Sequence, residues 1–181
     1  GIHCAPVEHS AIKVWCDQDL AVDADGTVTV PDPANASLQL ANNETGVIQA
    51  LPEGLGSSDL TQAFGKVPFA FNWLGVMAGF VSAHKLGGPK GIGALILKKG
   101  TDIQALIRGG GQEQGRRGGT ENLIGILGFA AVFQSLRSTV APADGGAQLV
   151  QHQLHPQLRD LVLHDEQHLV VVRRIGNRVQ I

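Results

Sequence analysis

A chain of 181 residues is long enough for one substantial hydrophobic core. Its 43% hydrophobic and 17% charged residues are ordinary for a globular domain, and a formal charge of -2 gives no reason to expect binding to nucleic acid or a membrane. No apolar run approaches membrane-spanning length, and two cysteines, Cys4 and Cys16, make no disulfide framework, so we expect a cytoplasmic protein in a reducing compartment.

The first residues, GIHCAPVEHSAI, are typical of a buried strand that runs into a helix, although the chain begins with Gly1 rather than Met. We therefore expect a piece of a longer polypeptide. Glycine is abundant, at 24 residues, and tyrosine is absent. Many turns must then bring backbone close to backbone or to a ligand, which favours a ligand-binding α/β protein.

Short apolar runs that end in polar or Gly-rich loops predict strands within residues 37–46, 77–85 and 93–100. A helix is predicted over residues 120–138, with Thr120 as its N-cap. The apolar residues at helical spacing that support it are Leu123, Leu127 and Ala131. Strands with loops at their ends, interleaved with helices, predict an α/β fold with a largely parallel sheet and sites along one rim.

Beyond this helix the composition changes twice. Residues 138–148 are small and polar, which predicts a linker. Residues 149–167 have a broken helical pattern, and residues 168–175, HLVVVRRI, predict a strand. We expect one main domain over residues 1–137, and then, over residues 149–181, the start of a small C-terminal domain or an altered tail.

The tail also contains four histidines that suggest a metal site. His152, His155, His164 and His168 have spacings that could place imidazoles on one helix face as zinc ligands. A polar helix face interrupted by Pro156 explains the same residues, and no metal-binding motif matches.

Two Gly-rich basic runs, residues 87–93 (GGPKGIG) and 109–119 (GGGQEQGRRGG), raise the question of a nucleotide site. A P-loop would require Ser or Thr after its lysine, but Lys90 is followed by Gly91. Neither run has the spacing of a dinucleotide fingerprint, so these two classes of nucleotide fold are not supported.

A set of polar residues lies at or near the ends of the expected elements. Each of them, taken alone, is more often a capping, loop or helix residue than a functional one. The set comprises His9, Asn43, Asp59, Gln62, Ser82, His84 and Lys85.

Together with SAHKLGGPKGIGAL and GGGQEQGRRGGTEN, this set resembles the cysteine desulfurases of iron–sulfur cluster assembly. These belong to the class V aminotransferase superfamily of pyridoxal-phosphate-dependent enzymes with fold type I. The resemblance runs from about His9 to Phe133. It implies that residues 1–137 are the central part of a cofactor-binding large domain, whose mostly parallel mixed sheet is flanked by helices, and that the cofactor is pyridoxal 5'-phosphate.

The resemblance assigns the catalytic roles to Lys85 and His9, and the contact with the ring nitrogen of the cofactor to Asp59. Lys85 would form the internal Schiff base with the cofactor aldehyde, which needs an amine in a partly desolvated site. Asp59 would keep the pyridinium nitrogen protonated, so that the ring can accept electrons from a substrate carbanion. His9 would stack on the ring and assist proton transfer.

The same resemblance assigns the remaining contacts to the cofactor. Gln62 and Asn43 would hydrogen-bond its phenolic oxygen, and Ser82 and His84 would bind its phosphate. Thr120 would reach the phosphate of a neighbouring subunit, because a hydroxyl and N–H groups near a helix start suit an anion. A homodimer with shared active sites is therefore expected.

The sequence departs from the family at the sulfur-carrying thiol. The family places this Cys on a loop well after the GTEN helix, but no Cys follows Cys16 here, and we expect Cys4 and Cys16 to be small buried side chains. None of Arg173, Arg174 and Arg178 can be assigned as the family's substrate-carboxylate Arg. The N-terminal Gly/Thr phosphate-binding loop is absent as well.

The reaction implied is conversion of L-cysteine to L-alanine, with the sulfur passed to an enzyme thiol or a sulfur-acceptor protein. Two alternatives stay open: another class V aminotransferase or lyase reaction, or a non-catalytic remnant or interaction module.

Residues 50–58, ALPEGLGSS, correspond to a shortened helix and strand of the family.

Overall fold

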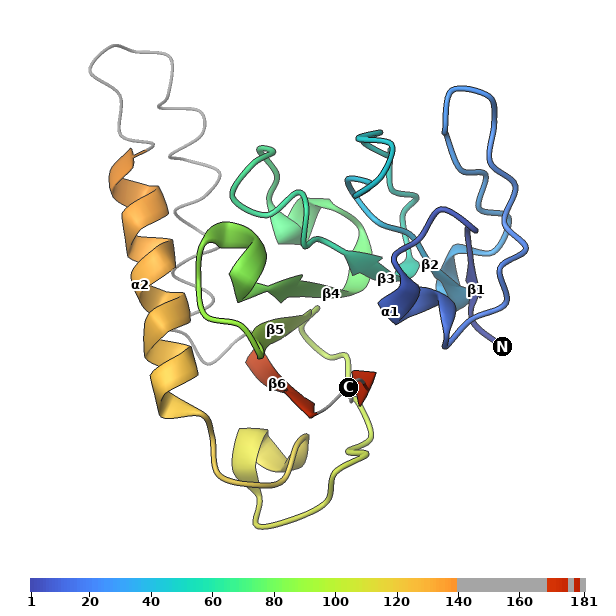
Figure 1. Cartoon of the computed structure of the whole chain (residues 1–181). Helices are drawn as coiled ribbons and strands as arrows, with labels where there is room; N and C mark the ends of the chain where they lie inside the picture. The colour runs from blue at the N-terminus through green and yellow to red at the C-terminus, as the bar shows by residue number, and fades with distance from the viewer. Residues whose placement is uncertain (140–168, 176–177, 180–181) are drawn as a thin grey trace.

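The computed structural model describes residues 1–139, 169–175 and 178–179. Their strands form one seven-stranded sheet in chain order, shown in Figure 1. The strands are β1 (His3–Cys4), β2 (Ala36–Ser37), β3 (Leu55–Asp59), β4 (Val76–Ser82), β5 (Ile92–Leu97), β6 (Leu169–Ile175) and β7 (Arg178–Val179).

The sheet is mixed. Strands β1 to β4 pair in parallel, and β5, β6 and β7 continue it in antiparallel. The expected strand within residues 37–46 begins one residue earlier, as β2, and its extended chain continues to bond β3 through Leu38 and Leu40 N–H. The strands expected within 77–85 and 93–100 are present as β4 and β5. The α/β class and the mixed sheet are therefore confirmed.

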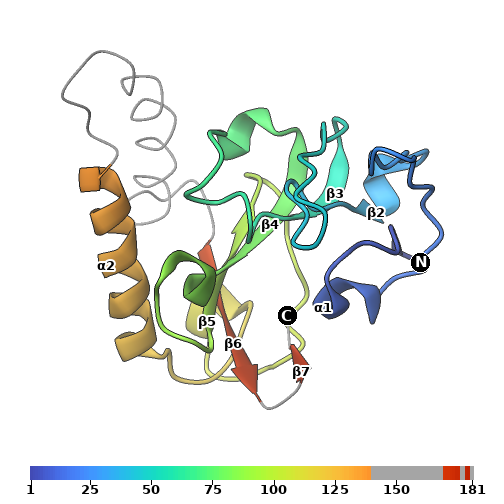
Figure 2. The ribbon, with the colours of Figure 1, turned by 45° about the horizontal axis from the view of Figure 1, so that its top comes forward.

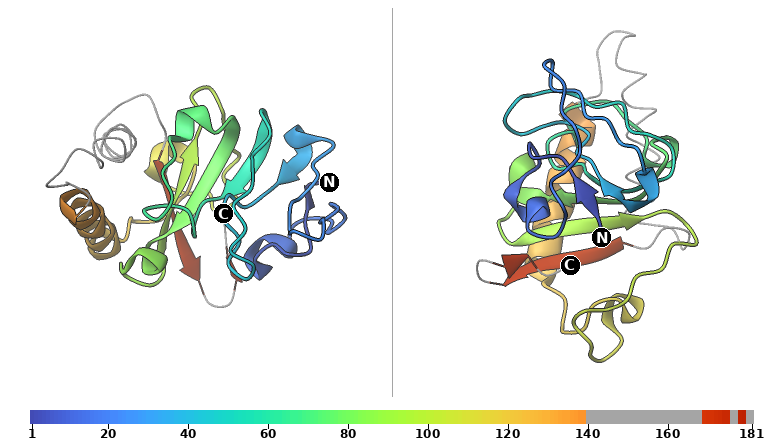
Figure 3. Two further views of the ribbon diagram at one scale, coloured as in Figure 1. Left: turned by 90° about the horizontal axis from the view of Figure 1, so that it is seen from above. Right: turned by 90° about the vertical axis from the view of Figure 1, so that its right-hand side faces the viewer.

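Two α-helices flank this sheet. The four-residue helix α1 (Ser10–Lys13) lies near the β1 edge, and α2 (Leu123–Thr139) packs against β5 and the turn that follows β4, as Figures 2 and 3 show. Short 3-10 helices complete the described chain: η1 (Pro33–Asn35), η2 (Phe71–Trp73), η3 (Ala83–Leu86) and η4 (Gln112–Gly115).

The start of α2 corrects the expected N-cap. The helix begins at Leu123, and Asn122 Oδ1 accepts a hydrogen bond from the Gly125 N–H at 3.1 Å. Thr120 lies before this point and is exposed. The Asn side chain is as good a cap as Thr, so the pattern of residues alone did not distinguish the two.

The face of α2 that packs into the protein also differs from expectation. Phe129 and Phe133 are buried, and the Phe133 ring lies 5.0 Å from that of Phe64. Leu123 and Leu127, which marked the expected helix, are 66% and 69% exposed. Helical periodicity was correct, but the aromatic stripe rather than the leucine stripe faces the core.

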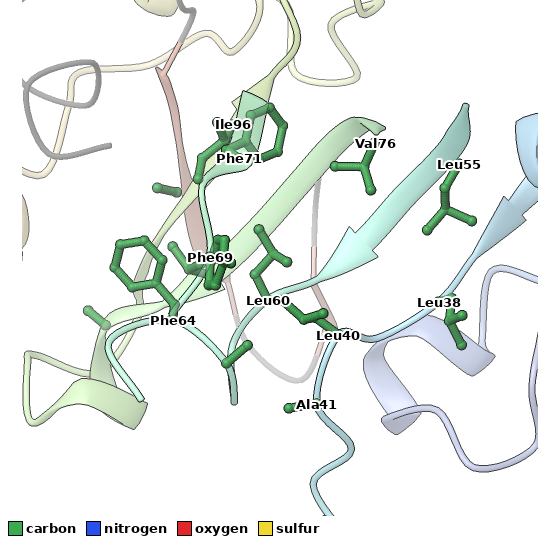
Figure 4. Close-up of a cluster of buried hydrophobic side chains, with 14 of the residues drawn as sticks. Leu38, Leu40, Ala41, Leu55, Leu60, Phe64, Phe69, Phe71, Val76 and Ile96 are labelled. Carbon is green, nitrogen blue, oxygen red and sulfur yellow. The ribbon is translucent and has the colours of Figure 1, made fainter. Parts of the chain in front are cut away.

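The main core lies along the strands β3, β4 and β5 (Figure 4). Every residue of β5 is buried, because one of its faces joins the main core and Leu95 and Leu97 pack on the other face. A strand covered on both sides has a continuous apolar sequence, which explains the run IGALIL. The largest fully buried apolar side chains of the main core are Leu38, Leu55, Leu60 and Val76.

Strand β3 lies in the shortened segment ALPEGLGSS, which carries little strand propensity. A Cβ at Gly56 would lie 2.6 Å from the Ala34 carbonyl oxygen, so only glycine allows this close approach. Ser58 Oγ donates to the Leu38 carbonyl at 2.7 Å, which satisfies a polar side chain inside the sheet.

The two cysteines correct a second expectation. Cys4 and Cys16 are joined in a disulfide, with their Cα atoms 5.9 Å apart, rather than being separate buried thiols. The physical reason is the return of the chain after α1: Cys4 N–H donates to Asp17 O at 2.8 Å, and Asp17 N–H donates to Ile2 O at 2.9 Å. This backbone pairing brings the cysteines within bridging distance.

The expected strand at 168–175 is present as β6, which pairs with β5 and so adds to the same sheet. Helix α2 continues through Thr139, so the first residues of the expected linker are helical. The rest of 138–148, the region 149–167 and the four tail histidines lie outside the described residues. The division into a main domain, a linker and a tail stays a prediction. None of the described helices has the length and apolar character needed to cross a membrane.

Candidate active site

The parallel strands bring the candidate residues to one edge of the sheet. Asp59 of β3 lies beside Phe80 of β4, and Leu40 N–H donates to the Asp59 carbonyl at 3.1 Å. The carboxyl ends of β1 to β4 therefore meet at a common edge. The segments that leave this edge carry His9 after β1, Asn43 after β2, Asp59 and Gln62 at and after β3, and Ser82, His84 and Lys85 at and after β4.

Asp59 and His9 act on one another electrostatically at this edge. Burial raises the pKa of Asp59, while hydrogen bonds from Thr61 and the charge of His9 oppose that rise. The Thr61 N–H donates to Asp59 Oδ1 at 2.8 Å. His9 is the N-cap of α1, where its Nδ1 accepts from the Ala11 N–H at 3.1 Å. The site thus holds a carboxyl group and an imidazole in fixed, neighbouring positions.

The residues after β4 form a compact polar turn. Ser82 Oγ lies 2.8 Å from His84 Nδ1, so the hydroxyl and the imidazole form one hydrogen-bonded unit. Lys85 follows in η3 and is exposed, and Gly87 ends this short helix with φ 86°, a left-handed conformation that favours glycine. The turn can therefore present a hydroxyl, an imidazole and an amine to one ligand.

Gln62 and Lys66 form the next part of the site. They lie in the turn after β3, and Lys66 Nζ donates to Gln62 Oε1 at 2.6 Å. Desolvation lowers the pKa of Lys66, and the positive charge of Lys85 lowers it further. The two ammonium groups, on the segments after β3 and β4, are therefore close enough to repel each other.

Two of the expected residues have weaker positional support. Asn43 is exposed and its Nδ2 donates to Glu44 Oε1 at 2.7 Å, which orients it toward its own loop. Its neighbour Asn42 is buried, and it donates to the Val7 carbonyl at 2.7 Å. The structure places Thr120 on the exposed segment before α2 and gives it no described role within this set.

Glu8 is a residue at this edge that the sequence reasoning missed. It is 2% exposed, and the Gln39 N–H donates to its Oε1 at 2.7 Å. Burial raises its pKa to about 8, although the bond from Gln39 opposes the rise, and the charge of Asp59 adds to it. A Glu beside a helix start is typical of a solvated surface, so no local signal marked Glu8 as buried.

The Gln39 side chain completes the surroundings of Glu8. With its amide nitrogen turned toward the Glu8 carboxyl group, its amide oxygen accepts from Asn42 Nδ2 at 3.0 Å. Asn42 Oδ1 in turn accepts from the N–H groups of Glu44 and Thr45, each at 2.8 Å. This network ties the segment that carries His9 to the loop after β2.

The described part of the chain has no group of three His, Cys, Asp or Glu residues that could hold a metal ion. The clustered functional groups are instead a carboxyl, imidazoles, an amide, a hydroxyl and amines. These groups suit an organic ligand that carries both an anionic group and a reactive carbonyl.

Comparison with known proteins agrees with this chemistry. Residues 10–166 match the family model described as aminotransferase class-V. A relative from Cereibacter sphaeroides named cysteine desulfurase is 40% identical over 151 residues, which cover 68% of this chain and 39% of that relative. The chain thus spans about two fifths of the length of that curated relative.

Solved structures show the same likeness. A NifS-like protein has a TM-score of 0.62 and 32% identity, with 77% of this chain and 47% of that chain covered. A structure of SspA in complex with cysteine has a TM-score of 0.60 and 28% identity, with 72% and 46% covered.

Proposed function

Because the chain belongs to the aminotransferase class-V family, we propose that its sheet edge is the cofactor site of a pyridoxal-phosphate-dependent cysteine desulfurase. The observation that carries the proposal is the convergence of His9, Asp59, Gln62 and the Ser82–Lys85 turn at the carboxyl ends of parallel strands. Relatives named cysteine desulfurase support the choice of this reaction within the family.

The donor set fits the cofactor group by group. The Ser82 hydroxyl and His84 imidazole, joined at 2.8 Å, are suited to bind a phosphate group. Lys85 offers the amine that bonds covalently to an aldehyde carbon. Asp59 would hold the ring nitrogen, and a cation there would offset the burial that raises the pKa of this carboxyl group.

When bound, pyridoxal phosphate supplies an electron sink for the carbanion that forms on an amino acid. The residues of this chain orient the ring and move protons. His9 is suited to cover the ring face and exchange a proton with the substrate, because the hydrogen bond from the Ala11 N–H to its Nδ1 holds the imidazole at the start of α1. Gln62, with Asn43 as a further candidate, would bond the phenolic oxygen.

We propose L-cysteine as the substrate and a thiol as the sulfur acceptor. The sulfur would leave the β-carbon of cysteine and join the acceptor, so that cysteine and a thiol become alanine and a persulfide. Cys4 and Cys16 are joined to each other and neither offers a free thiol. The acceptor thiol is therefore proposed to lie outside these 181 residues.

We further propose a homodimer with shared sites. Three exposed apolar residues in the first turns of α2 support it: Leu123, Ile124 and Leu127 are 66%, 85% and 69% exposed. Apolar groups gathered on one helix face are typical of a surface that another protein covers. Thr120 lies just before this face and would contribute to the neighbouring site.

The first experiment tests covalent attachment. The 181-residue chain is incubated with pyridoxal phosphate, reduced with borohydride, and measured by intact mass and peptide mapping. We expect one adduct on Lys85, which Lys85→Ala abolishes because no other amine follows the Ser82–His84 unit directly.

Lys90→Ala is the matched control, since Lys90 lies in the same connection between β4 and β5, beyond the end of η3, and this variant should retain the adduct. Failure of the unaltered chain to form any adduct would overturn the proposed cofactor site. An adduct that persists in Lys85→Ala would overturn the assignment of Lys85.

A further inference from the structure

The turn after β3 separates its apolar and polar residues by helical spacing. Phe64 N–H donates to Leu60 O at 2.7 Å, and Val67 N–H donates to Ala63 O at 2.8 Å, so the backbone here makes helical turns. Leu60, Ala63 and Phe64 are buried in the core. Gly65, with a left-handed φ of 72°, interrupts the helical geometry, and the side chains of Gln62 and Lys66 meet across it through a hydrogen bond.

Lys66 determines which end of the Gln62 amide is available. A glutamine amide has one acceptor oxygen and two N–H donors. Lys66 Nζ donates to the oxygen at 2.6 Å, so a reversed amide would place two donors against each other. This donation holds whether the amine is charged or neutral, because both forms carry N–H groups. Gln62 thus offers its N–H groups, rather than its oxygen, to a ligand.

The charge of Lys66 also acts on Lys85, the residue proposed to bond to the cofactor. Besides Lys66 itself, the titratable groups at this sheet edge are Glu8, His9, Asp59, His84 and Lys85. The charges of Lys85 and Lys66 repel each other, and so do those of Asp59 and Glu8. Any effect of Lys66 on a ligand could therefore act through the Gln62 amide or through charge alone, and an experiment has to separate the two.

We propose that Lys66 is a positioning residue, which holds the Gln62 amide with its N–H groups directed toward the phenolic oxygen of a cofactor bonded to Lys85. The inference rests on the proposed function and adds to it a residue outside the contacts assigned to the cofactor. Its consequence is that the deprotonated phenolic oxygen is stabilised by a donor whose orientation is fixed in advance.

The test follows the absorbance of bound pyridoxal phosphate through a pH titration. A donor to the deprotonated oxygen lowers the pH at which the bound cofactor loses its proton. Lys66→Met removes the amine but keeps much of the side-chain length. We expect it to raise the midpoint by roughly half to one pH unit, the equivalent of one ordinary hydrogen bond.

A double-mutant cycle separates positioning from charge. In a Gln62→Ala background, Lys66→Met should shift the midpoint by no more than about a third as much as in the unaltered chain. The reason is that the amide that Lys66 orients is then absent. Lys66→Arg keeps both N–H donors and charge, and should restore a midpoint close to that of the unaltered chain. Thermal unfolding of each variant checks that the exposed substitution leaves the fold intact.

Each outcome of the titrations decides between the inference and the proposed function. A shift of equal size in both backgrounds would overturn the inference, because Lys66 would then act by charge and not through Gln62. A normal titration in the unaltered chain with no shift in Lys66→Met would overturn the inference but leave the proposed function standing. The absence of any bound-cofactor absorbance in the unaltered chain would overturn both.

Discussion

Glu8 is a carboxyl group whose surroundings favour its neutral form. It is 2% exposed, and burial raises its pKa from 4.5 to about 8. The folded chain therefore keeps a proton that the unfolded chain releases at lower pH. The contribution of Glu8 to stability is fully present below about pH 4.5 and is lost as the pH rises toward 8.

We predict that Glu8→Gln flattens the pH dependence of stability. In the unaltered chain the free energy of unfolding should fall between pH 5 and 8, and Glu8 should contribute at most about 1.4 kcal/mol per pH unit to that fall. Glu8→Gln removes this contribution, because a glutamine side chain does not titrate. Urea unfolding at several pH values measures it. Both chains keep Asp59, so its titration largely cancels in the comparison.

Glu53→Gln is the control for this experiment, because the Glu53 side chain is 82% exposed. The free energy of unfolding of this variant should change with pH at the same slope as that of the unaltered chain. Identical slopes in Glu8→Gln and the unaltered chain would show that Glu8 does not hold a proton in the folded state.

The segment from β1 through α1 is an element closed by the disulfide of Cys4 and Cys16. The bridge spans 12 positions and encloses both Glu8 and His9. Cross-linking a loop of this size restricts the unfolded chain and stabilises the folded one by roughly 3 kcal/mol. The disulfide therefore supports the segment on which the ring-stacking candidate lies.

We predict that reductant lowers the thermal midpoint of the unaltered chain. The loss should be close to that caused by replacing both cysteines with serine, because each change removes the same constraint. Differential scanning calorimetry with and without reductant measures the shift. The double Cys→Ser variant is the control and should be insensitive to reductant; an unaltered chain that is equally insensitive would contradict the bridge.

At the scale of the whole molecule, α2 and α1 lie at opposite ends of the sheet (Figure 3). Helix α2 buries Phe129 and Phe133 against the core and leaves Ile124 and Leu127 exposed. One helix thus presents apolar groups on two faces. In a helix of an isolated domain the outer face is ordinarily polar, so the second face favours an association surface.

We predict that Ile124→Lys and Leu127→Lys each shift a dimer toward monomer by tenfold or more in dissociation constant, the equivalent of about 1.4 kcal/mol. Sedimentation equilibrium over a range of concentrations measures the shift. Val14→Lys changes an equally exposed position on the α1 side and should leave the dimer intact. A chain that stays monomeric at every concentration would contradict the homodimer.

The sequence by itself determined the chemistry carried by short contiguous motifs. SAHK places a hydroxyl, an imidazole and an amine within four residues, strand β5 follows from a continuous apolar run, and helix α2 follows from helical periodicity. The family resemblance of these motifs was likewise readable from the sequence. Such features depend on neighbours along the chain, so the sequence contains what is needed to predict them.

Only the tertiary structure decided which distant residues meet and which faces are buried. The buried state of Glu8, the pairing of Cys4 with Cys16 and the choice of Phe129 over Leu127 for the core all depend on segments far apart in sequence. Local residue patterns do not contain these distances, and burial and electrostatic effects follow from them. Strand β3 was expected only through the family resemblance of its segment, because its own propensity is weak and close packing around Gly56 overrides it.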